Sequence, residues 1–496
     1  MRKDRDVNIL MVSAEMAPFA KVGGLADVVT ALSGALAGRK HDVRVVMPLY
    51  GHLDRQKEKI RPLAKLPPLS VRVGHKMHDI RFHLRGSARS AVKVYLVECE
   101  TLFGRPGVYL DEEGQAFPDR LARAALHGQA ALLLARLLDW PVDVVHAHDA
   151  EAAPALLYRG HWYTGRELPG PAGTLLTIHN LAHQEVHPVE GVETLGLPRS
   201  MAAYPGLLEF HGHVNLLKAG ILAADRVNTV SPTYAMETTS DAVYGCGLEG
   251  ILSGRGDEYS GILTGADYKT WDPRRDPALP APFGPASLDG KSTCRTELAR
   301  ELGLDLGQGK PLCGFVGRLV AQKGVELMLP LLARLGQDGF TFAILGTGDR
   351  KLEAAVKKIS DRMGDRVAFV GAFDEALAHR IYAGSDLFLM PSIFEPCGLS
   401  QMYSLRYGTL PVVRKTGGLA DTIVDASRRN GTGFVFEEPV PEDLMVALRR
   451  AETLWDDQVA WGKVRDRGMV CDFSWKQAAG RYEKLYRAVR RAGKDS

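Results

Sequence analysis

Short runs of Val, Ile and Leu recur along the chain, and each is followed by a Gly or polar turn and then by a helical pattern. Continuous apolar runs predict strands of a parallel sheet covered on both faces. Their alternation with helical patterns predicts two doubly wound, Rossmann-like α/β domains, one in each half of the chain. The runs are residues 7–13, 43–47, 142–146, 175–178 and 227–230, then 312–316, 342–345, 367–370, 387–390 and 410–413.

The length of 496 residues also favours two domains, because one hydrophobic core rarely grows to that size. Residues 272–290 are dense in Pro, Asp and Ala and read as a loop or linker. We expect a first domain over residues 1–255, a second over 256–470 and a C-terminal helical segment over 471–496. Composition leaves open whether that segment packs on the first domain.

Composition excludes several classes of protein. The chain is 45% hydrophobic and 24% charged, and its net charge of +3 gives no reason to expect nucleic acid or an anionic membrane as partner. No run is long enough to span a bilayer, and the start does not resemble a signal peptide, so we expect a cytoplasmic protein. Six scattered cysteines without C-x-x-C spacing indicate neither a zinc site nor a disulfide framework.

One motif occurs twice. Lys21 and the pair Gly23-Gly24 precede a helical pattern, and so do Lys415 and the pair Gly417-Gly418. Glycines let a ligand approach the backbone, and a helix that starts there offers free N–H groups to an anion. Two copies suggest that two similar halves serve one ligand.

Ligands of such sheets bind beyond the carboxyl ends of the strands, so the residues after each strand carry the chemistry. His146 and His148 share a side of the strand and could be metal ligands, but no third ligand has zinc-like spacing. Asp149 is either a carboxylate facing a sugar or the cap of the next helix. His179 either bonds a substrate hydroxyl or bonds a neighbouring loop.

The second half offers cations and a carboxylate at the equivalent places. Arg318 and Lys323 suit a diphosphate, although exposed surface charge is the common alternative. Glu395 could hold sugar hydroxyls with the backbone of Gly398 and Leu399, or it could belong to a tight turn. The turn at 346–349 lacks the full dinucleotide fingerprint, so no nicotinamide cofactor is indicated.

Together these segments resemble the starch synthase family of retaining GT-B glucosyltransferases, which includes the bacterial glycogen synthases. The matching segments cover nearly the whole chain: SAE at 13–15, KVGGLADV at 21–28, HAHD at 146–149, TIHNLA at 177–182, residues 210–235, GLEG at 247–250, Gly265 and Asp267, GRL and QKG at 317–324, FEPCGL at 394–399 and KTGGLAD at 415–421.

The resemblance implies two Rossmann-like domains facing a central cleft and transfer of glucose from ADP-glucose to the non-reducing 4-hydroxyl of glycogen or another α-1,4-glucan. Retention of configuration, no metal and no cofactor are further implications. The residues that it assigns to catalysis are Asp149, His179, Arg318, Lys323 and Glu395. The residues that it assigns to substrate binding are Lys21, Gly23, Gly24, Thr264, Phe373, Cys397, Gly398, Leu399, Thr416, Gly417 and Gly418.

Several positions depart from the family pattern. Ala150 and Glu151 replace Trp-His after HAHD, which bears on acceptor binding. His183 and Glu185 replace Tyr and Gly, Thr264 replaces Asn, and Tyr403 stands where many GT-B enzymes carry a second acid. Phe373 stands where tyrosine usually stacks on the base.

These departures keep two alternatives open: a related retaining transferase that uses UDP-glucose or another acceptor, and a weakly active glucan-binding protein. The sequence leaves open the nucleotide base, the glucan length, the oligomeric state and the degree of domain closure. Because no residue has a clear base beside it, front-face attack is favoured over a protein nucleophile.

Overall fold

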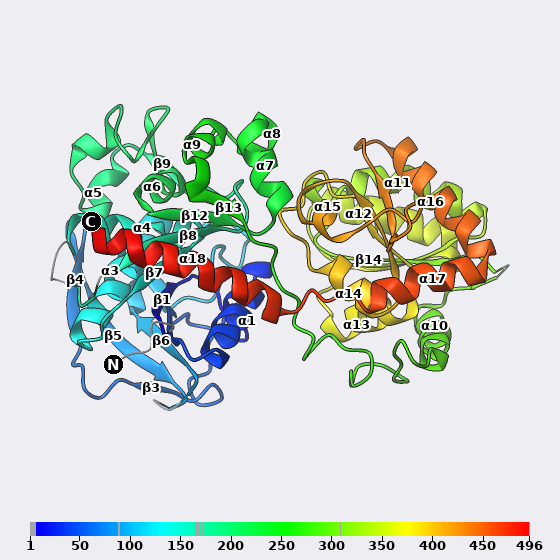
Figure 1. The fold of residues 1–496 in the computed structure, drawn as a ribbon, viewed down its shortest axis with the longest axis horizontal. Helices are drawn as coiled ribbons and strands as arrows, with labels where there is room; N and C mark the ends of the chain where they lie inside the picture. Colours follow the sequence, from blue (N-terminus) through cyan, green and yellow to red (C-terminus); the bar gives the residue numbers. More distant parts are fainter. Residues whose placement is uncertain (1–5, 88–89, 164–167, 171, 308, 496) are drawn as a thin grey trace. The chain divides into compact units, whose positions relative to one another are not determined.

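The computed structural model describes residues 6–87, 90–163, 168–170, 172–307 and 309–495 (Figure 1). The chain divides into two compact units. The first consists of residues 1–230, 235–265 and 475–496, and the second of residues 231–234 and 266–474. Each unit is described by itself.

The first unit is built on a ten-stranded sheet. Its parallel part runs in the order β13 (Tyr259–Gly261), β12 (Arg226–Thr229), β8 (Gly173–Ile178), β7 (Val144–His148), β1 (Asn8–Val12), β2 (Asp42–Pro48) and β6 (Val92–Glu98). Antiparallel strands extend it beyond β6: β5 (Lys76–Arg85), with β3 (Ile60–Pro62) and β4 (Leu69–Val73) beside it.

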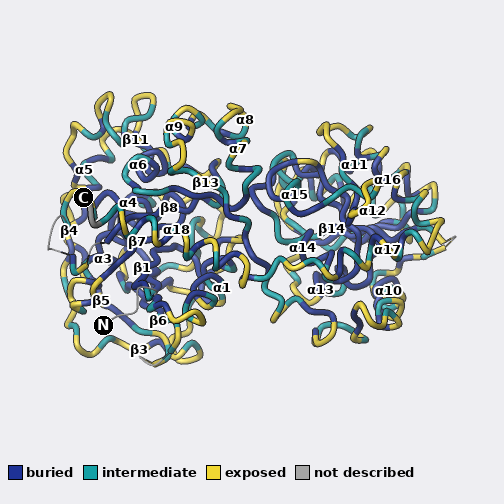
Figure 2. The backbone as a smooth tube through the Cα atoms, viewed as in Figure 1, coloured by how far each residue is buried: buried dark blue, intermediate teal, exposed yellow. Residues whose placement is uncertain are grey.

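Two groups of helices cover this sheet. In one group α1 (Gly24–Gly38) packs beside α18 (Trp475–Asp495), and α18 contacts β7 and β8. In the other group α4 (Asp149–His161) packs between α3 (Arg120–Leu137) and α6 (Leu216–Ala223). The central strands are buried along their whole length, as the dark strands of Figure 2 show. Burial on both faces explains their continuous apolar sequences.

The second unit contains a parallel six-stranded sheet in the order β16 (Val367–Val370), β15 (Thr341–Leu345), β14 (Leu312–Val316), β17 (Leu387–Met390), β18 (Leu410–Arg414) and β19 (Phe434–Phe436). Its longer helices are α10 (Asp289–Leu302), α11 (Val325–Gln337), α12 (Arg350–Met363), α13 (Glu375–Gly384), α16 (Pro441–Asp456) and α17 (Gln458–Met469). Side chains of α11, α16 and the sheet form one buried apolar cluster.

Shorter elements complete the described chain. The short helices are α2 (Glu100–Phe103), α5 (Gly191–Leu195), α7 (Pro232–Ser240), α8 (Ala242–Gly245), α9 (Glu249–Gly254), α14 (Ser400–Arg406) and α15 (Gly417–Thr422). Single 3-10 turns occupy Arg199–Ala202, Gly256–Glu258, Ala321–Lys323 and Gly364–Arg366, and a small sheet joins β9 (Val186–Pro188), β10 (Glu209–Phe210) and β11 (His213–Asn215). No helix among the described residues is long and apolar enough to cross a membrane.

All ten predicted strands are present, and the predicted α/β class with parallel sheets is confirmed. One boundary was wrong: β7 continues to His148, so His146 and His148 lie inside the strand rather than after it. The antiparallel strands β3 to β5 were missed. In β5 buried and exposed residues alternate over most of the strand, a pattern that a search for continuous apolar runs passes over.

Candidate active site

In the first unit Glu15 organises the loop that carries Lys21. Glu15 follows β1 and is 3% exposed. Its Oε2 accepts hydrogen bonds from the amides of Val22 (2.7 Å) and Gly23 (3.1 Å), and its Oε1 accepts one from the Tyr109 hydroxyl (2.7 Å). The buried carboxylate thus fixes the loop before α1 by charge-assisted bonds.

The loop ends as the sequence predicts, with α1 beginning at Gly24 and Gly23 as its N-cap. A Cβ built on Gly23 or Gly24 would meet nothing within 4 Å. The glycines therefore leave open space rather than fill a packing need. Lys21 is partly exposed, and its Nζ lies 3.0 Å from a carboxylate oxygen of Asp27 in the first turn of the helix.

The histidines of β7 do not form a metal site. Both ring nitrogens of His146 are hydrogen-bonded, Nδ1 with the Tyr486 hydroxyl (2.9 Å) and Nε2 with Thr177 Oγ1 (2.6 Å). Among the described residues no group of three or more His, Cys, Asp or Glu side chains could hold a metal ion. The metal-ligand interpretation of His146 and His148 is therefore wrong, because the first ring already has two protein partners.

Asp149 and His179 meet at the carboxyl ends of β7 and β8. The Asp149 carboxylate accepts a hydrogen bond of 2.6 Å from the His179 amide, and His179 Nε2 lies 3.1 Å from His148 Nδ1. The helix-cap alternative for Asp149 does not hold, since α4 has His148 as N-cap and no side-chain cap bond. Burial raises the pKa of Asp149 to about 7, so that this carboxyl is divided between its neutral and charged forms near pH 7. Burial lowers the pKa of His179 to about 3, so that ring is neutral there.

Asp149 has backbone φ +60°, in the left-handed region. Such strain at a non-glycine residue is costly and tends to occur at functional sites. The carboxylate is placed where the strand turns sharply into α4, which brings it back over the amide of His179.

Glu151 and Glu185, two of the departures from the family pattern, line one small hollow together with Tyr109, Arg120 and Arg123. Arg120 Nη1 lies 2.9 Å from Glu185 Oε1, whereas Nη1 of the buried Arg123 has no hydrogen-bond partner among the described residues. Burial, with the charges of Asp149 and Glu185, raises the pKa of Glu151 to about 8. The hollow therefore contains both donors and acceptors.

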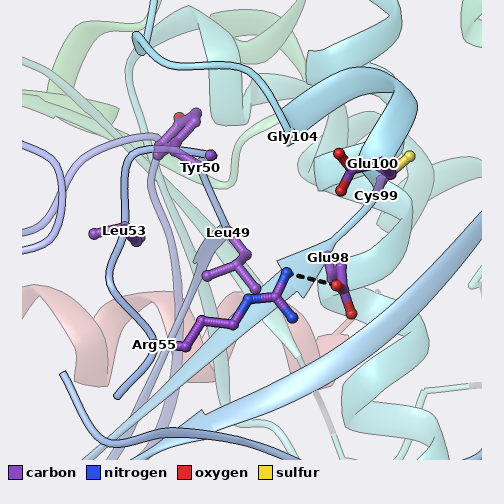
Figure 3. Close-up of a pocket in the computed structure, with 9 residues that line it drawn as sticks. Leu49, Tyr50, Leu53, Arg55, Glu98, Cys99, Glu100 and Gly104 are labelled. Atoms are coloured by element: carbon purple, nitrogen blue, oxygen red, sulfur yellow. Dashed lines mark hydrogen bonds and ion pairs between the residues drawn. The ribbon is translucent and has the colours of Figure 1, made fainter. Parts of the chain in front are cut away.

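A second hollow, which is also lined by Tyr50, lies at the carboxyl ends of β2 and β6. Its volume is about 240 Å³, and its walls include Arg55, Glu98 and Glu100 (Figure 3). Arg55 Nη2 donates to Glu98 Oε1 at 2.6 Å. This ion pair occupies Arg55, the cation of the hollow.

In the second unit Arg318 lies in the turn after β14, where the predicted cations were expected. Its side chain is exposed and makes no hydrogen bond or ion pair within the described ranges. The Gly-rich turn after β15 supports this turn, because the Leu319 amide donates to the Thr347 carbonyl (2.9 Å) and the Asp349 amide to the Leu319 carbonyl (2.7 Å). A Cβ at Gly346 would meet the Gly317 carbonyl at 1.9 Å, so the close approach requires glycine.

Lys323 and Glu395 are brought together as an ion pair. Lys323 Nζ lies 2.6 Å from Glu395 Oε2, which also accepts a hydrogen bond of 2.9 Å from the Ser392 hydroxyl. Glu395 is 5% exposed. A cation and a carboxylate that pair in this way present a positive and a negative group side by side to one ligand.

The two loops FEPCGL and KTGGLAD interlock. The Gly418 amide donates to the Glu395 carbonyl at 3.1 Å. A Cβ at Gly417 would meet the Glu395 carbonyl at 2.0 Å, and one at Gly418 would meet the Cys397 carbonyl at 2.1 Å. Gly417 also has φ +43°. These two glycines therefore serve internal packing of the loop that holds Glu395.

The remaining predicted residues have separate settings. Thr264 is buried, and its amide donates to the Val230 carbonyl (3.2 Å). Thr416 is buried as N-cap of α15, Gly398 has φ +72°, and Leu399 is N-cap of α14. Phe373 is 84% exposed. Tyr403 stacks on Trp271 with ring centroids 4.2 Å apart.

Sequence reasoning missed the residues that hold the predicted ones. Tyr109 and Ser392 each bond a carboxylate of the site, and Ser231 donates to the Pro396 carbonyl at 2.6 Å within the second unit. Their partners lie far away in sequence or across a loop. No local pattern marks them, apart from the Thr-Val-Ser-Pro-Thr-Tyr segment that contains Ser231.

Two doubly wound units, one with carboxylates at its strand ends and one with Arg, Lys and glycine loops, have the architecture of a GT-B glycosyltransferase. Comparisons with known proteins agree. The model of the starch synthase catalytic domain matches residues 8–254, and that of glycosyl transferases group 1 matches residues 303–465.

The chain is 42% identical to a glycogen synthase 2 of Geobacter metallireducens, over 97% of this chain and 98% of that protein. It is 43% identical to a glycogen synthase of an Anaeromyxobacter species, over 97% and 99%. The catalytic domain of starch synthase IV from Arabidopsis thaliana, solved with ADP and acarbose, has a TM-score of 0.89 and 32% identity over 98% of this chain and 99% of that chain. The chain therefore belongs to the glycogen and starch synthase family, and it is a glucosyltransferase of the glycogen synthase type.

Proposed function

We propose that this chain transfers glucose from ADP-glucose to the non-reducing 4-hydroxyl of an α-1,4-glucan with retention of configuration. The observation that carries the proposal is the Lys323–Glu395 pair, held by the interlocked FEPCGL and KTGGLAD loops. The Arabidopsis homologue bound to ADP and acarbose supports an adenine nucleotide and a glucan as ligands.

Arg318 and Lys323 stabilise the charge that develops on the departing diphosphate. Arg318 supplies a planar fork that has no partner among the described residues, and Lys323 supplies a point charge that leaves Glu395 when phosphate binds. The backbone at Thr416, Gly417 and Gly418 supports the same phosphates, and Phe373 covers the base. Lys21, Gly23 and Gly24 serve the same donor from the first unit.

Asp149, His179, Glu395, Cys397 and Gly398 hold the hydroxyls of the glucose. Attack occurs from the front face, and the leaving phosphate takes the proton of the acceptor hydroxyl. Glu395 binds hydroxyls in this mechanism and forms no covalent bond. Thr264 contributes a hydroxyl that can donate and accept.

The six cysteines are free thiols in the structure, which supports a reducing compartment, and we propose the cytoplasm.

The role of Lys323 is tested by Lys323→Ala, with transfer of labelled glucose into glycogen as the assay. We expect kcat to fall by roughly 100-fold to 1000-fold, the usual cost of losing one group that stabilises developing charge. Lys310→Ala is the matched control, because Lys310 forms an ion pair of similar length with Glu452 away from these loops. Equal activity of the two variants would contradict the assignment.

The role of Glu395 is tested by Glu395→Gln, which keeps the hydrogen bonds but cannot act as a nucleophile. Little loss of activity and no trapped intermediate would exclude a nucleophilic role. A glucosyl adduct on Glu395 of the native enzyme, detected by mass spectrometry, would overturn front-face attack.

A further inference from the structure

A chain of buried hydrogen bonds runs from α18 into the sheet of the first unit. The Tyr486 hydroxyl lies 2.9 Å from His146 Nδ1, His146 Nε2 lies 2.6 Å from Thr177 Oγ1, and Thr177 Oγ1 lies 2.7 Å from Asn228 Oδ1. All four side chains are inaccessible to solvent. Their protons must therefore be shared among themselves.

The direction of each bond follows from counting protons. Thr177 has one hydroxyl proton, and it donates that proton to Asn228 Oδ1. Thr177 Oγ1 therefore accepts at His146, so Nε2 carries the ring proton. Burial lowers the pKa of His146 to about 3, so the ring is neutral and Nδ1 has a free lone pair. Nδ1 accepts the proton of Tyr486, and Asn228 Nδ2 donates onward to the Tyr482 hydroxyl (3.2 Å).

From His146 the contacts continue to the site. The rings of His146 and His148 are packed with centroids 4.0 Å apart, and His148 Nδ1 lies 3.1 Å from His179 Nε2. His148 Nε2 has no hydrogen-bond partner among the described residues. The ring of His148 is therefore oriented by its packing on His146 and by its bond to His179, whose amide in turn bonds Asp149.

We propose that Tyr486 is a positioning residue for the transfer reaction: by donating to Nδ1 it fixes the ring plane of His146, whose Nε2–H tautomer Thr177 sets, and ring packing passes that orientation to the His148–His179 pair beside Asp149. The proposal rests on the proposed roles of His179 and Asp149 at the sugar. Tyr486 itself touches no reacting atom, and it acts through two histidines. A residue of the last helix thereby sets the geometry at the carboxyl ends of β7 and β8.

Helix α18 also makes ion pairs outside the Tyr486–His146–Thr177 hydrogen bonds, and these ion pairs supply a control. Glu483 bonds Arg39 at 2.6 Å and His41 at 3.0 Å, on the part of α18 that packs beside α1. We expect Glu483→Gln to weaken the attachment of the helix to Arg39 and His41 and to leave the Tyr486–His146–Thr177 bonds in place. A merely structural role of α18 predicts that Glu483 and Tyr486 variants behave alike.

The experiment compares Tyr486→Phe with Glu483→Gln in the full chain, by steady-state transfer and by thermal unfolding. We expect Tyr486→Phe to lower kcat roughly tenfold to 100-fold, the range for misplaced catalytic groups, with KM for the donor changed less than about twofold. Glu483→Gln should lower the melting temperature and leave kcat within about twofold of the wild type. Loss of kcat that merely follows loss of stability in both variants would overturn the proposal.

A double variant tests the route through His146. Because Tyr486 and Thr177 both act on that ring, the double variant Tyr486→Phe with Thr177→Val should have the same kcat as Thr177→Val alone. In the double variant Glu483→Gln with Thr177→Val, the two losses of kcat should add. Additive losses in the first pair would contradict the route.

A spectroscopic measurement separates this proposal from the proposed function. Nitrogen-15 NMR of histidine-labelled protein should show a neutral Nε2–H tautomer for His146, assigned with His146→Gln, and a shifted Nδ1 resonance in Tyr486→Phe, where that nitrogen loses its donor. An unchanged Nδ1 resonance would refute the positioning role even in an active enzyme. A wild type that transfers no glucose while the Nδ1 resonance responds as expected would refute the proposed function instead.

Discussion

At the residue scale, burial raises the pKa of two carboxyl groups of the first unit, Asp149 and Glu151. The charges of Asp149, Glu185 and Glu15 act on Glu151, and Arg120 pairs with Glu185. The pKa of Glu151 is raised to about 8, chiefly by desolvation and then by Asp149. Such a group is neutral when the protein folds at neutral pH and becomes a buried charge in alkali.

This state predicts a pH-dependent stability that Glu151→Gln should remove. Because the pKa of Glu151 is higher in the folded chain than in the unfolded chain, its contribution to the free energy of unfolding is complete below about pH 4.5, the unfolded pKa. That contribution is lost as the pH rises through about 8, the folded pKa. Relative to Glu151→Gln, the native chain should lose a few kcal/mol of unfolding free energy between about pH 5 and pH 9.

Urea unfolding at both pH values measures the difference. Glu442→Gln, in the exposed first turn of α16, serves as the control, and its difference from the native chain should not change with pH. A pH-independent difference between native and Glu151→Gln proteins would show that Glu151 stays ionised.

The positions of individual residues were partly predictable. Arg318 lies in the turn after β14, and Lys323 and Glu395 form an ion pair, in the turns that follow strands where the sequence analysis expected them; their roles stay predictions. The partners that orient them could not be named, since Glu15–Tyr109 and His146–Tyr486 join residues 94 and 340 positions apart. Sequence spacing carries no information about such contacts until the sheet order is known.

At the element scale, the two glycine motifs look alike but serve different needs. Around Gly23 and Gly24 a Cβ would find open space, whereas at Gly417 and Gly418 it would overlap backbone carbonyls of the FEPCGL loop. In both motifs a helix begins within the glycine pair, at the second glycine, Gly24, in the first copy and at the first glycine, Gly417, in the second copy. The packing around the two pairs differs.

This difference predicts opposite effects of alanine at the two motifs. Gly417→Ala should lower the unfolding free energy by about 1–3 kcal/mol and reduce activity, because the new methyl group displaces the carbonyl of Glu395. Gly23→Ala and Gly24→Ala should fold with native stability and instead raise KM for the donor. Thermal unfolding and steady-state kinetics of the three variants measure these effects on stability and on KM. Equal destabilisation at both motifs would contradict the distinction.

The strands show why part of the fold was predictable. Strands buried on both faces, such as β1, β7 and β14, read as continuous Val, Ile and Leu runs and were found. Strand β5 has one exposed face, so charged residues interrupt its apolar ones, and β4 with β3 shares that character. Finding them requires a search for period-two alternation as well.

At the scale of the whole molecule, the chain has two separate cores and no covalent cross-link among its cysteines. Cys99, Cys294, Cys313 and Cys397 are buried, and Cys246 and Cys471 are partly exposed. Burial raises the pKa of Cys313 well above its ordinary value, which keeps that thiol protonated.

Thiol titration tests this account. Without reductant, the denatured protein should react as six thiols, the number that the structure shows, and the native protein should react more slowly at the buried four. Prior treatment with reductant should leave the denatured count unchanged. A count that rises after reduction would reveal a disulfide that this structure does not contain.

The central claim is that the chain is an ADP-glucose-dependent glucan synthase. The most direct measurement incubates the full chain with glycogen and either labelled ADP-glucose or labelled UDP-glucose, and counts label in the polymer. We expect incorporation from ADP-glucose and little from UDP-glucose. Preference for UDP-glucose would contradict the proposed donor, and no incorporation from either would contradict the proposed reaction and direct attention to Ala150 and Glu151.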